Sequence, residues 1–176
     1  MRKHSINEEV KKRLLILDGG LGTLVQGYGL TEEDFRGDEF ASWPVPLKGC
    51  NDLLVLTRPG VIGEIHRRYL EAGADIITTD TFSATSVSLE DYGLQDYAYA
   101  ISRAGAEVAR KAADEFTRRD PQKPRYVAGS VGPTNRTSSI AADMNNTALR
   151  DITFGTLATA YEVQIEGLVD GGADII

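Results

Sequence analysis

The chain has 176 residues, of which 41% are hydrophobic and 26% charged, a composition typical of a globular protein with enough length for one core. Its formal net charge of −7 argues against nucleic acid or an anionic membrane as the main partner. No apolar run is long enough for a transmembrane helix, and the polar N-terminus lacks the apolar stretch of a signal peptide. A single cysteine, Cys50, excludes an internal disulfide, and together these features predict a cytoplasmic setting.

The N-terminal third is expected to contain a short helix, a buried strand and a long loop. The helix is predicted at residues 6–13. Residues 14–17 form a continuous apolar run that ends at Asp18-Gly19-Gly20, a pattern typical of a strand buried on both faces. Residues 21–56 are rich in Gly, Pro and acidic side chains with little periodicity, which predicts a long loop.

Amphipathic helices and short apolar strands alternate through the rest of the chain. Thr57 is a predicted N-cap, and Pro59 fits the first turn of a helix that ends at Gly73. The later elements are a strand at 75–80, a helix at 94–112, a strand at 125–130, a loop from 132, a helix at 154–168 and a strand at 174–176. This order predicts a parallel α/β sheet.

Two architectures contain parallel strands in this order. A doubly wound sheet needs Gly-x-Gly-x-x-Gly after its first strand, and this chain has Gly20 and Gly22 but Val25 at the third position. The three complete strands instead end in polar or glycine residues, at the end where barrel enzymes place their sites. We therefore expect the N-terminal half, about four strands, of a (β/α)8 TIM-type barrel.

Residues 71–77 and 170–176 resemble each other. In both, a helix ends on glycine and leads through Ala-Asp-Ile-Ile into a strand. Ordinary helix-to-strand turn chemistry explains this similarity, and so does a repeated structural unit. The second copy stops where the first continues into Thr78, Thr79 and Asp80. Residues 1–176 are therefore expected to form one partial barrel domain, truncated inside or near its fourth strand.

Polar residues at the strand ends are the candidate binding residues. Asp18 can hold an ammonium group, and the glycines Gly19 and Gly20 leave backbone amides open to a carboxylate or phosphate. Thr79 and Ser130, at the next two strand ends, can hydrogen-bond a polar ligand. Each feature also has a purely structural explanation, because Asp-Gly-Gly forms tight turns and hydroxyl side chains commonly terminate strands.

Several motifs are more specific than this pattern. They are Leu17-Asp18-Gly19-Gly20-Leu21-Gly22-Thr23, Asp34-Phe35-Arg36-Gly37, Leu47-Lys48-Gly49, Asn51-Asp52-Leu53-Leu54, Gly73-Ala74-Asp75-Ile76-Ile77 and Gly132-Pro133-Thr134-Asn135-Arg136-Thr137. From about Ile16 to the last residue, the sequence resembles the N-terminal homocysteine-binding module of cobalamin-dependent methionine synthase, within the homocysteine S-methyltransferase family.

That resemblance implies an eight-stranded barrel that binds L-homocysteine and, through three cysteines, zinc. Zinc lowers the pKa of the thiol, and the thiolate takes a methyl group from methylcobalamin to give methionine. The family's zinc cysteines are expected beyond Ile176, and Cys50 matches none of them. The fragment is therefore expected to hold neither zinc nor cobalamin fully, to contain no catalytic residue and to be inactive alone.

Among the strand-end residues, Asp18 matches the family's first-strand aspartate, which lies near the substrate amino group. Gly19 and Gly20 match its glycine turn. At the second strand the family pattern Glu-Thr-Asn-Thr-Phe is replaced by residues 78–82, Thr-Thr-Asp-Thr-Phe. The predicted substrate-binding residues are Asp18, Gly19, Gly20, Thr79 and Ser130.

Two other functions remain open. Betaine- or S-methylmethionine-homocysteine methyltransferases share the Asp-Gly-Gly start, whereas the Asp34 and Gly132 motifs favour the cobalamin enzyme. The chain could instead be a non-catalytic half-barrel that assembles with another chain. The expected partners are L-homocysteine, the remaining half-barrel with the cobalamin and folate modules, and a second copy through exposed sheet edges.

Overall fold

A computed structural model describes residues 5–138, 141–143 and 146–176. Its central element is a parallel pair of strands, β1 (Ile76–Thr78) and β2 (Tyr126–Ala128), with Ile77 opposite Val127. Parallel bridges from Leu17 to Ile76 and from Ala128 to Ile175 place a further segment on each side of the pair. Four segments thus run side by side in sequence order, which confirms the predicted parallel α/β organisation.

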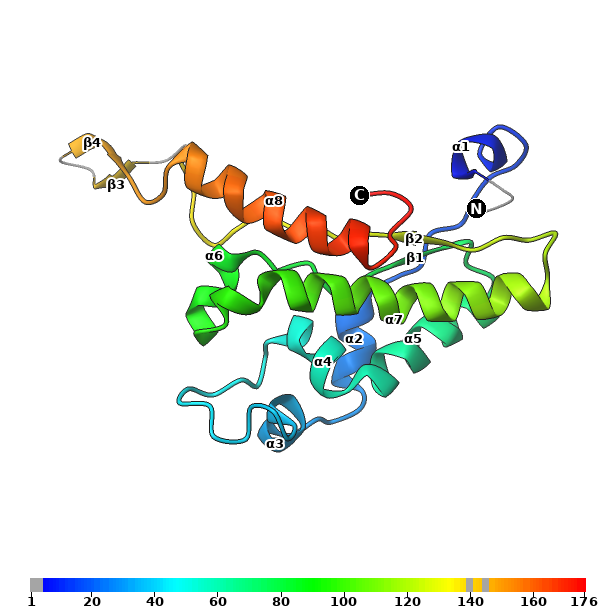
Figure 1. Cartoon of the computed structure of the whole chain (residues 1–176), viewed down its shortest axis with the longest axis horizontal. Coiled ribbons are helices and arrows are strands. Elements are labelled where there is room, and N and C mark those ends of the chain that lie inside the picture. The colour runs from blue at the N-terminus through cyan, green and yellow to red at the C-terminus, as the bar shows by residue number, and fades with distance from the viewer. Residues whose placement is uncertain (1–4, 139–140, 144–145) are drawn as a thin grey trace.

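Helices supply most of the remaining structure. They are α1 (Ile6–Glu9), α2 (Leu21–Gln26), α3 (Glu32–Arg36), α4 (Leu54–Thr57), α5 (Pro59–Glu71), α6 (Ser86–Leu89), α7 (Ala98–Arg119) and α8 (Phe154–Asp170), with 3-10 turns η1 (Asn51–Leu53), η2 (Glu90–Tyr92) and η3 (Gln95–Tyr97). The long helix α7 packs against α5, α8, β1 and β2 (Figure 1). In the described part of the chain, no helix is both long enough and apolar enough to cross a bilayer.

Helix α5 begins at Pro59 as predicted, but its N-cap is Arg58, not Thr57. Thr57 is the last residue of α4, and its hydroxyl lies 3.5 Å from the Leu53 carbonyl oxygen that it faces. Thr57, which the sequence pattern predicted to cap α5, is therefore part of α4 instead. Fully buried Ile62 and Ile65 fix the inward face of α5.

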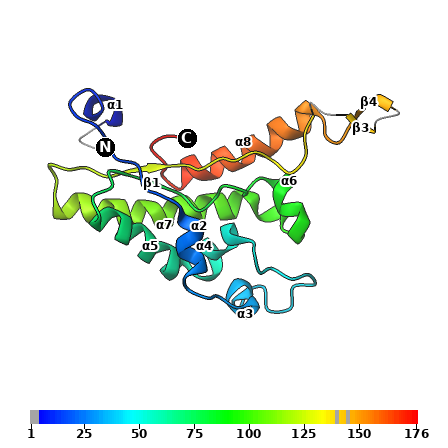
Figure 2. The ribbon, with the colours of Figure 1, turned by 180° about the vertical axis from the view of Figure 1, so that it is seen from behind.

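Residues 21–56 are not the long loop that the composition predicted, because they contain α2, α3, η1 and α4. Arg36 donates to the carbonyl oxygens of Trp43 and Val45, at 2.6 and 3.0 Å. Glu32 accepts from the backbone amides of Leu47 and Lys48. These two charged side chains satisfy backbone groups that have no strand or helix partner, and they thereby stabilise the segment around α3. This segment lies on the far side of α2 and α4 from the sheet (Figures 1 and 2).

Two further predictions need correction. Residues 14–17 were expected to be buried on both faces, yet Leu14 is 92% exposed and Leu17 is also exposed. The reason is that this segment lies at the edge of the described sheet and pairs with β1 alone. The loop predicted from residue 132 contains an antiparallel hairpin, β3 (Ala141–Asp143) and β4 (Asn146–Arg150).

The two similar sequence segments form the same structure twice. Gly73 and Gly172 end α5 and α8 with φ of +109° and +97°, a conformation that favours glycine. Asp75 then accepts a hydrogen bond from the Ile16 amide at 3.0 Å, and Asp174 accepts one from the Val127 amide at 2.8 Å. Each aspartate thus ties its strand to the preceding one. Because turn chemistry alone does not require this link, the repeated-unit interpretation is favoured.

The glycines of α8 let this helix pack closely against α7. A Cβ atom added at Gly167 would lie 2.7 Å from the Tyr99 carbonyl oxygen, and one at Gly171 would lie 2.3 Å from that of Arg103. The close approach lets Gln164 of α8 reach the ends of the strands.

Candidate functional site

Two hydroxyl groups that follow β1 form a connected set with the backbone that follows β2. The Thr79 hydroxyl oxygen accepts a hydrogen bond from the Ser130 amide at 2.9 Å and lies 2.6 Å from the Thr81 hydroxyl oxygen. The Thr81 hydroxyl donates in turn to the Ser130 carbonyl at 2.9 Å. Two of the predicted site residues, Thr79 and Ser130, are therefore brought together, as expected for the carboxyl ends of neighbouring parallel strands.

Gln164 is a member of this set that sequence reasoning missed. It is fully buried, and its Nε2 donates to the Thr81 carbonyl at 2.6 Å and lies 3.4 Å from that of Ser130. The available signal was an amide side chain on the otherwise apolar inward face of α8, next to Ala160 and Leu168. Gln164 therefore helps to hold the backbone carbonyl groups of Thr81 and Ser130 in position.

Asp18 lies beside β1, where its carboxylate accepts from both the amide and the hydroxyl of Thr78, at 2.9 and 3.0 Å. Burial raises the pKa of Asp18 above its ordinary value, although the hydrogen bonds from Thr78 act in the opposite direction. Beside it, the Gly20 carbonyl accepts from the Tyr69 hydroxyl at 3.1 Å. The Asp-Gly-Gly turn is thus held by β1 and α5.

A cavity of about 380 Å³, here called the strand-end cavity, opens at the carboxyl ends of the strands. Its polar wall is formed by Asn51, Asp52, Thr78, Thr79, Asp80, Ser83 and Ser130. Of the residues predicted to bind substrate, Thr79 and Ser130 line it. Asp18, Gly19 and Gly20 are not among its lining residues, and Asp18 reaches it only through Thr78.

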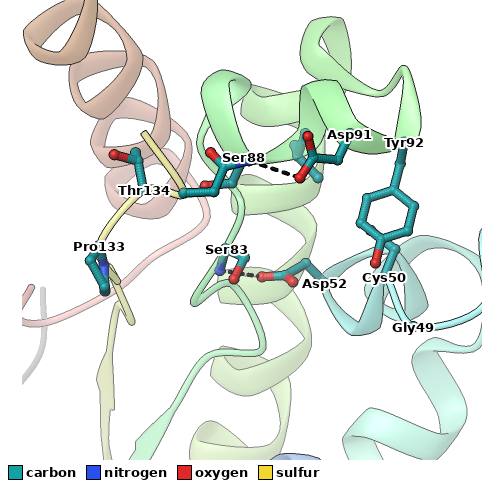
Figure 3. Close-up of a pocket in the computed structure, with 11 residues that line it drawn as sticks. Gly49, Cys50, Asp52, Ser83, Ser88, Asp91, Tyr92, Pro133 and Thr134 are labelled. Carbon is teal, nitrogen blue, oxygen red and sulfur yellow. Dashed lines mark hydrogen bonds between the residues drawn. The ribbon is translucent and has the colours of Figure 1, made fainter. Parts of the chain in front are cut away.

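Two buried carboxyl groups of this cavity have perturbed pKa values. Burial is the main cause that raises the pKa of Asp52, whose Oδ1 accepts from the Ser83 amide at 2.8 Å (Figure 3). Burial, together with the charge of Asp52, raises the pKa of Asp80 well above its ordinary value. Nearby Cys50 is also buried, which raises the pKa of its thiol to about 12. A thiol with that pKa is not a nucleophile at neutral pH.

A second cavity of about 330 Å³, here called the loop cavity, adjoins the first and shares Gly49, Asp52 and Ser83 with it (Figure 3). Its other side is formed by Pro133, Thr134 and Asn135 of the Gly-Pro-Thr-Asn motif together with residues 88–92. Asn135 donates to the Asp91 carboxylate at 2.8 Å. The motif therefore connects the chain after β2 to the turn that follows α6.

Replacement of Thr79 by Val is expected to lower the free energy of unfolding by roughly 1–3 kcal/mol, because the buried Ser130 amide and Thr81 hydroxyl both lose a partner. Urea unfolding followed by circular dichroism measures the change. Thr159→Val, at an exposed position in the middle of α8, is the matched control and should change stability by less than about 0.5 kcal/mol. Equal losses for both variants would contradict the proposed hydroxyl set.

No three His, Cys, Asp or Glu side chains of the described residues lie in an arrangement that could hold a metal ion. The residues present in this part of the chain therefore do not fit a zinc site by themselves.

The fold resembles that of solved homocysteine methyltransferases. For MmuM from Escherichia coli, the oxidized form matches with 24% identity and a TM-score of 0.71 over 98% of this chain and 56% of that one. The metallated form matches with 23% identity and a TM-score of 0.70 over 97% and 55%, and the apo form with 22% and 0.61 over 94% and 49%. The chain thus spans about half the length of these structures.

The family model for homocysteine S-methyltransferase matches residues 15–176, nearly the whole sequence. This range agrees with the extent of the resemblance that the sequence motifs indicated, and it begins at the segment that pairs with β1. The chain belongs to the homocysteine S-methyltransferase family.

Proposed function

We propose that this chain is part of the homocysteine-binding, methyl-accepting module of a cobalamin-dependent methionine synthase. The observation that carries the methyl-accepting part of this proposal is the family match over residues 15–176, which includes every element around the strand-end cavity. In the proposed reaction the homocysteine sulfur loses its proton and gains a methyl group, which gives methionine. The chain's own contribution is to bind and orient the amino acid.

The order of the strands supports a half-barrel. Four parallel segments lie in sequence order, and α5, α7 and α8 each lead from one segment toward the next. This is the succession found in a (β/α)8 barrel. We infer that the exposed edges at Leu17 and Ile176 pair with the remaining half-barrel.

Thr79 and Ser130 are proposed to contact the substrate directly, since both line the strand-end cavity. Asp18 is proposed to act by holding Thr78, and Gly19 and Gly20 by forming the turn that brings α2 to the rim of the cavity. Zinc, which the family resemblance implies, would supply a Lewis acid for the thiol. The described residues do not fit it, so no step of the reaction is assigned to it within this chain.

The proposed methyl donor, methylcobalamin, rests on two sequence motifs, those at Asp34 and Gly132. In the structure these two motifs make different contacts. Asp34 pairs with Arg58 and Arg36 holds the chain after α3, while the Gly132 motif lines the loop cavity. An acceptor module of a betaine or S-methylmethionine enzyme is the second candidate. Those enzymes share the Asp18-Gly19-Gly20 turn, so this turn is compatible with both candidates.

The donor can be tested on the natural protein that contains this chain. L-Homocysteine is supplied with methylcobalamin, betaine or S-methylmethionine, and methionine is measured by mass spectrometry. Methionine formed from methylcobalamin is the expected result, with none from the isolated chain. Methionine formed only from betaine or S-methylmethionine would select the second candidate, and none from any donor would overturn both.

Self-association of the isolated chain is a further expected outcome. Leu14, Leu17 and Ile176 expose apolar side chains at the two edge segments of the described sheet. Such edges pair readily with another chain. Sedimentation velocity should therefore show a dimer or larger species at micromolar concentration. A single monomeric species under these conditions would contradict the inference that the edges pair.

A further inference from the structure

Helices α5 and α7 border a groove of about 270 Å³, here called the helix groove. The two helices pack against each other and lie side by side in Figures 1 and 2. The helix groove shares no lining residue with the strand-end cavity or the loop cavity, so it is separate from the candidate substrate site. Its lining includes Gly60, Gly63 and Arg67 from α5 and Val108, Lys111 and Ala112 from α7.

The helix groove contains two positive charges without a matching negative charge. Arg67 and Lys111 belong to its lining, and none of the described residues that line it is acidic. Neither side chain forms an ion pair or a hydrogen bond with another described residue. In a chain whose formal net charge is −7, these two cations therefore form a local positive patch.

The acidic side chains closest to Lys111 along α7 already have other partners. Each lies about one helical turn from Lys111 and pairs with an arginine of the same helix: Glu107 with Arg103, Asp114 with Arg110, and Glu115 with Arg119. The positive charge of Lys111 is therefore not matched by its own helix, and it remains available to an anionic group from outside the chain.

Two glycines keep the helix groove open although the described structure does not require them. Gly63 lies inside α5, where glycine destabilises a helix relative to alanine. A Cβ atom added there would lie 3.5 Å from Arg67 Nη1 and 3.7 Å from Val108 Cγ1, both ordinary contact distances. A Cβ atom added at Gly60 would meet nothing within 4 Å. The space along α5 thus suits an occupant that the described chain does not supply.

Carboxylate groups on a polypeptide match this groove better than a small inorganic anion does. Arg67 presents a planar guanidinium that can hold a carboxylate through two hydrogen bonds, and Lys111 adds a second cation from the neighbouring helix. Val108 and Ala112 line the same groove and are apolar. A small anion would leave this apolar lining uncovered, whereas a peptide segment can cover it and also pair with both cations.

We propose that the helix groove is a docking site for an acidic segment of a partner polypeptide. Carboxylates of that segment pair with Arg67 and Lys111, and an apolar side chain between them lies against Val108 and Ala112. The surface is additional to the substrate site and does not depend on the identity of the substrate or of the methyl donor, because the helix groove and the strand-end cavity share no residue.

Fluorescence anisotropy with labelled, terminally blocked peptides tests the proposal on the 176-residue chain. The probes are Glu-Glu-Leu-Glu-Glu and its neutral counterpart Gln-Gln-Leu-Gln-Gln. We expect the acidic peptide to bind about tenfold more tightly than the neutral one, with an affinity that falls as sodium chloride is added. Arg67→Gln and Lys111→Gln should each weaken binding of the acidic peptide about fivefold. Lys11→Gln, at an exposed position in the turn after α1, removes the same charge elsewhere and should leave affinity unchanged.

The variant Gly63→Ala separates loss of docking from loss of structure. It should raise the midpoint of urea unfolding, because alanine favours the helix, and it should weaken binding of the acidic peptide about threefold, because the added methyl group narrows the groove. A more stable variant with unchanged affinity would show that the peptide does not lie along α5 and would overturn the proposal.

Three further results would also overturn it. They are equal weakening by Lys11→Gln and by the groove variants, unchanged binding when Arg67 and Lys111 are both replaced by Gln, and binding of inorganic phosphate at the helix groove without binding of the acidic peptide. None of these results bears on methyl transfer to homocysteine, so the proposed function stands or falls separately.

Discussion

Replacement of Asp75 by Ala is expected to lower the free energy of unfolding by roughly 2–4 kcal/mol. The Asp75 side chain is 2% exposed, accepts from the Ile16 amide at 3.0 Å and pairs with Arg13 at 2.9 Å. Removing it leaves the partly buried Ile16 amide and the Arg13 guanidinium without this acceptor. It also removes one link between the edge segment and β1, while the backbone hydrogen bonds of Ile16 and Asp18 to β1 and its preceding residue remain. Urea unfolding followed by circular dichroism measures the loss.

Asp114→Ala is the matched control for this prediction. Asp114 also pairs with an arginine, Arg110 at 2.8 Å, but its side chain is 57% exposed. Exposed ion pairs contribute little, so this variant should change stability by less than about 1 kcal/mol. Asp174→Ala, at the equivalent position of the repeated unit, should resemble Asp75→Ala. If Asp75→Ala proved as stable as the parent chain, the structural role assigned to the repeated Ala-Asp turn would be wrong.

Acidification from pH 6.5 to pH 4 is expected to destabilise the fold through His66. The imidazole is fully buried in α5, and neither ring nitrogen has a hydrogen-bond partner among the described residues. Burial, with a smaller effect from Arg67, lowers the pKa of His66 to about 4 from 6.5. The unfolded chain therefore binds a proton in this range and the folded chain does not, so stability falls as the pH falls. The gap between the two values corresponds to roughly 3 kcal/mol.

The variant His66→Leu separates this effect from other titrations. Asp18, Asp52 and Asp80 have raised pKa values, so they bind protons more readily when folded and act in the opposite direction over the same range. Subtracting the pH dependence of His66→Leu from that of the parent chain isolates the histidine. A difference that stays constant between pH 4 and pH 6.5 would show that His66 does not carry the effect.

The order of the elements was predictable from sequence because it depends on local periodicity. Short apolar runs that end in polar or glycine residues marked β1 and β2, and Pro59 marked the start of α5. The meeting of Thr79 and Ser130 followed from topology, since neighbouring parallel strands end at the same edge. Those predictions needed no knowledge of distant contacts.

The predictions that failed depended on contacts between residues far apart in the sequence. Residues 21–56 were predicted to be a loop because their buried apolar side chains, such as Phe40 and Leu47, follow no regular helical or strand period. Part of the segment is also held by Arg36, which reaches carbonyl groups seven and nine residues away. Gln164 stood out only as an amide on an apolar helix face, and the sequence did not reveal its partner because Thr81 lies 83 residues earlier. The position of Asp18 outside the strand-end cavity was also hidden, because the hydrogen bonds from Thr78 that occupy Asp18 cross between segments 60 residues apart.

The most direct test of the central claim, that the strand-end cavity is the homocysteine site, is a titration of the chain with L-homocysteine observed through the NMR signals of its threonine methyl groups. We expect the signals of Thr78 and Thr79, which line the cavity, to shift in a saturable way. The signal of Thr117 should not shift. This residue lies on α7, and its hydroxyl forms hydrogen bonds with the Ala113 carbonyl and the Arg125 amide. Saturable shifts that leave Thr78 and Thr79 unchanged, or no shifts at all, would contradict the claim.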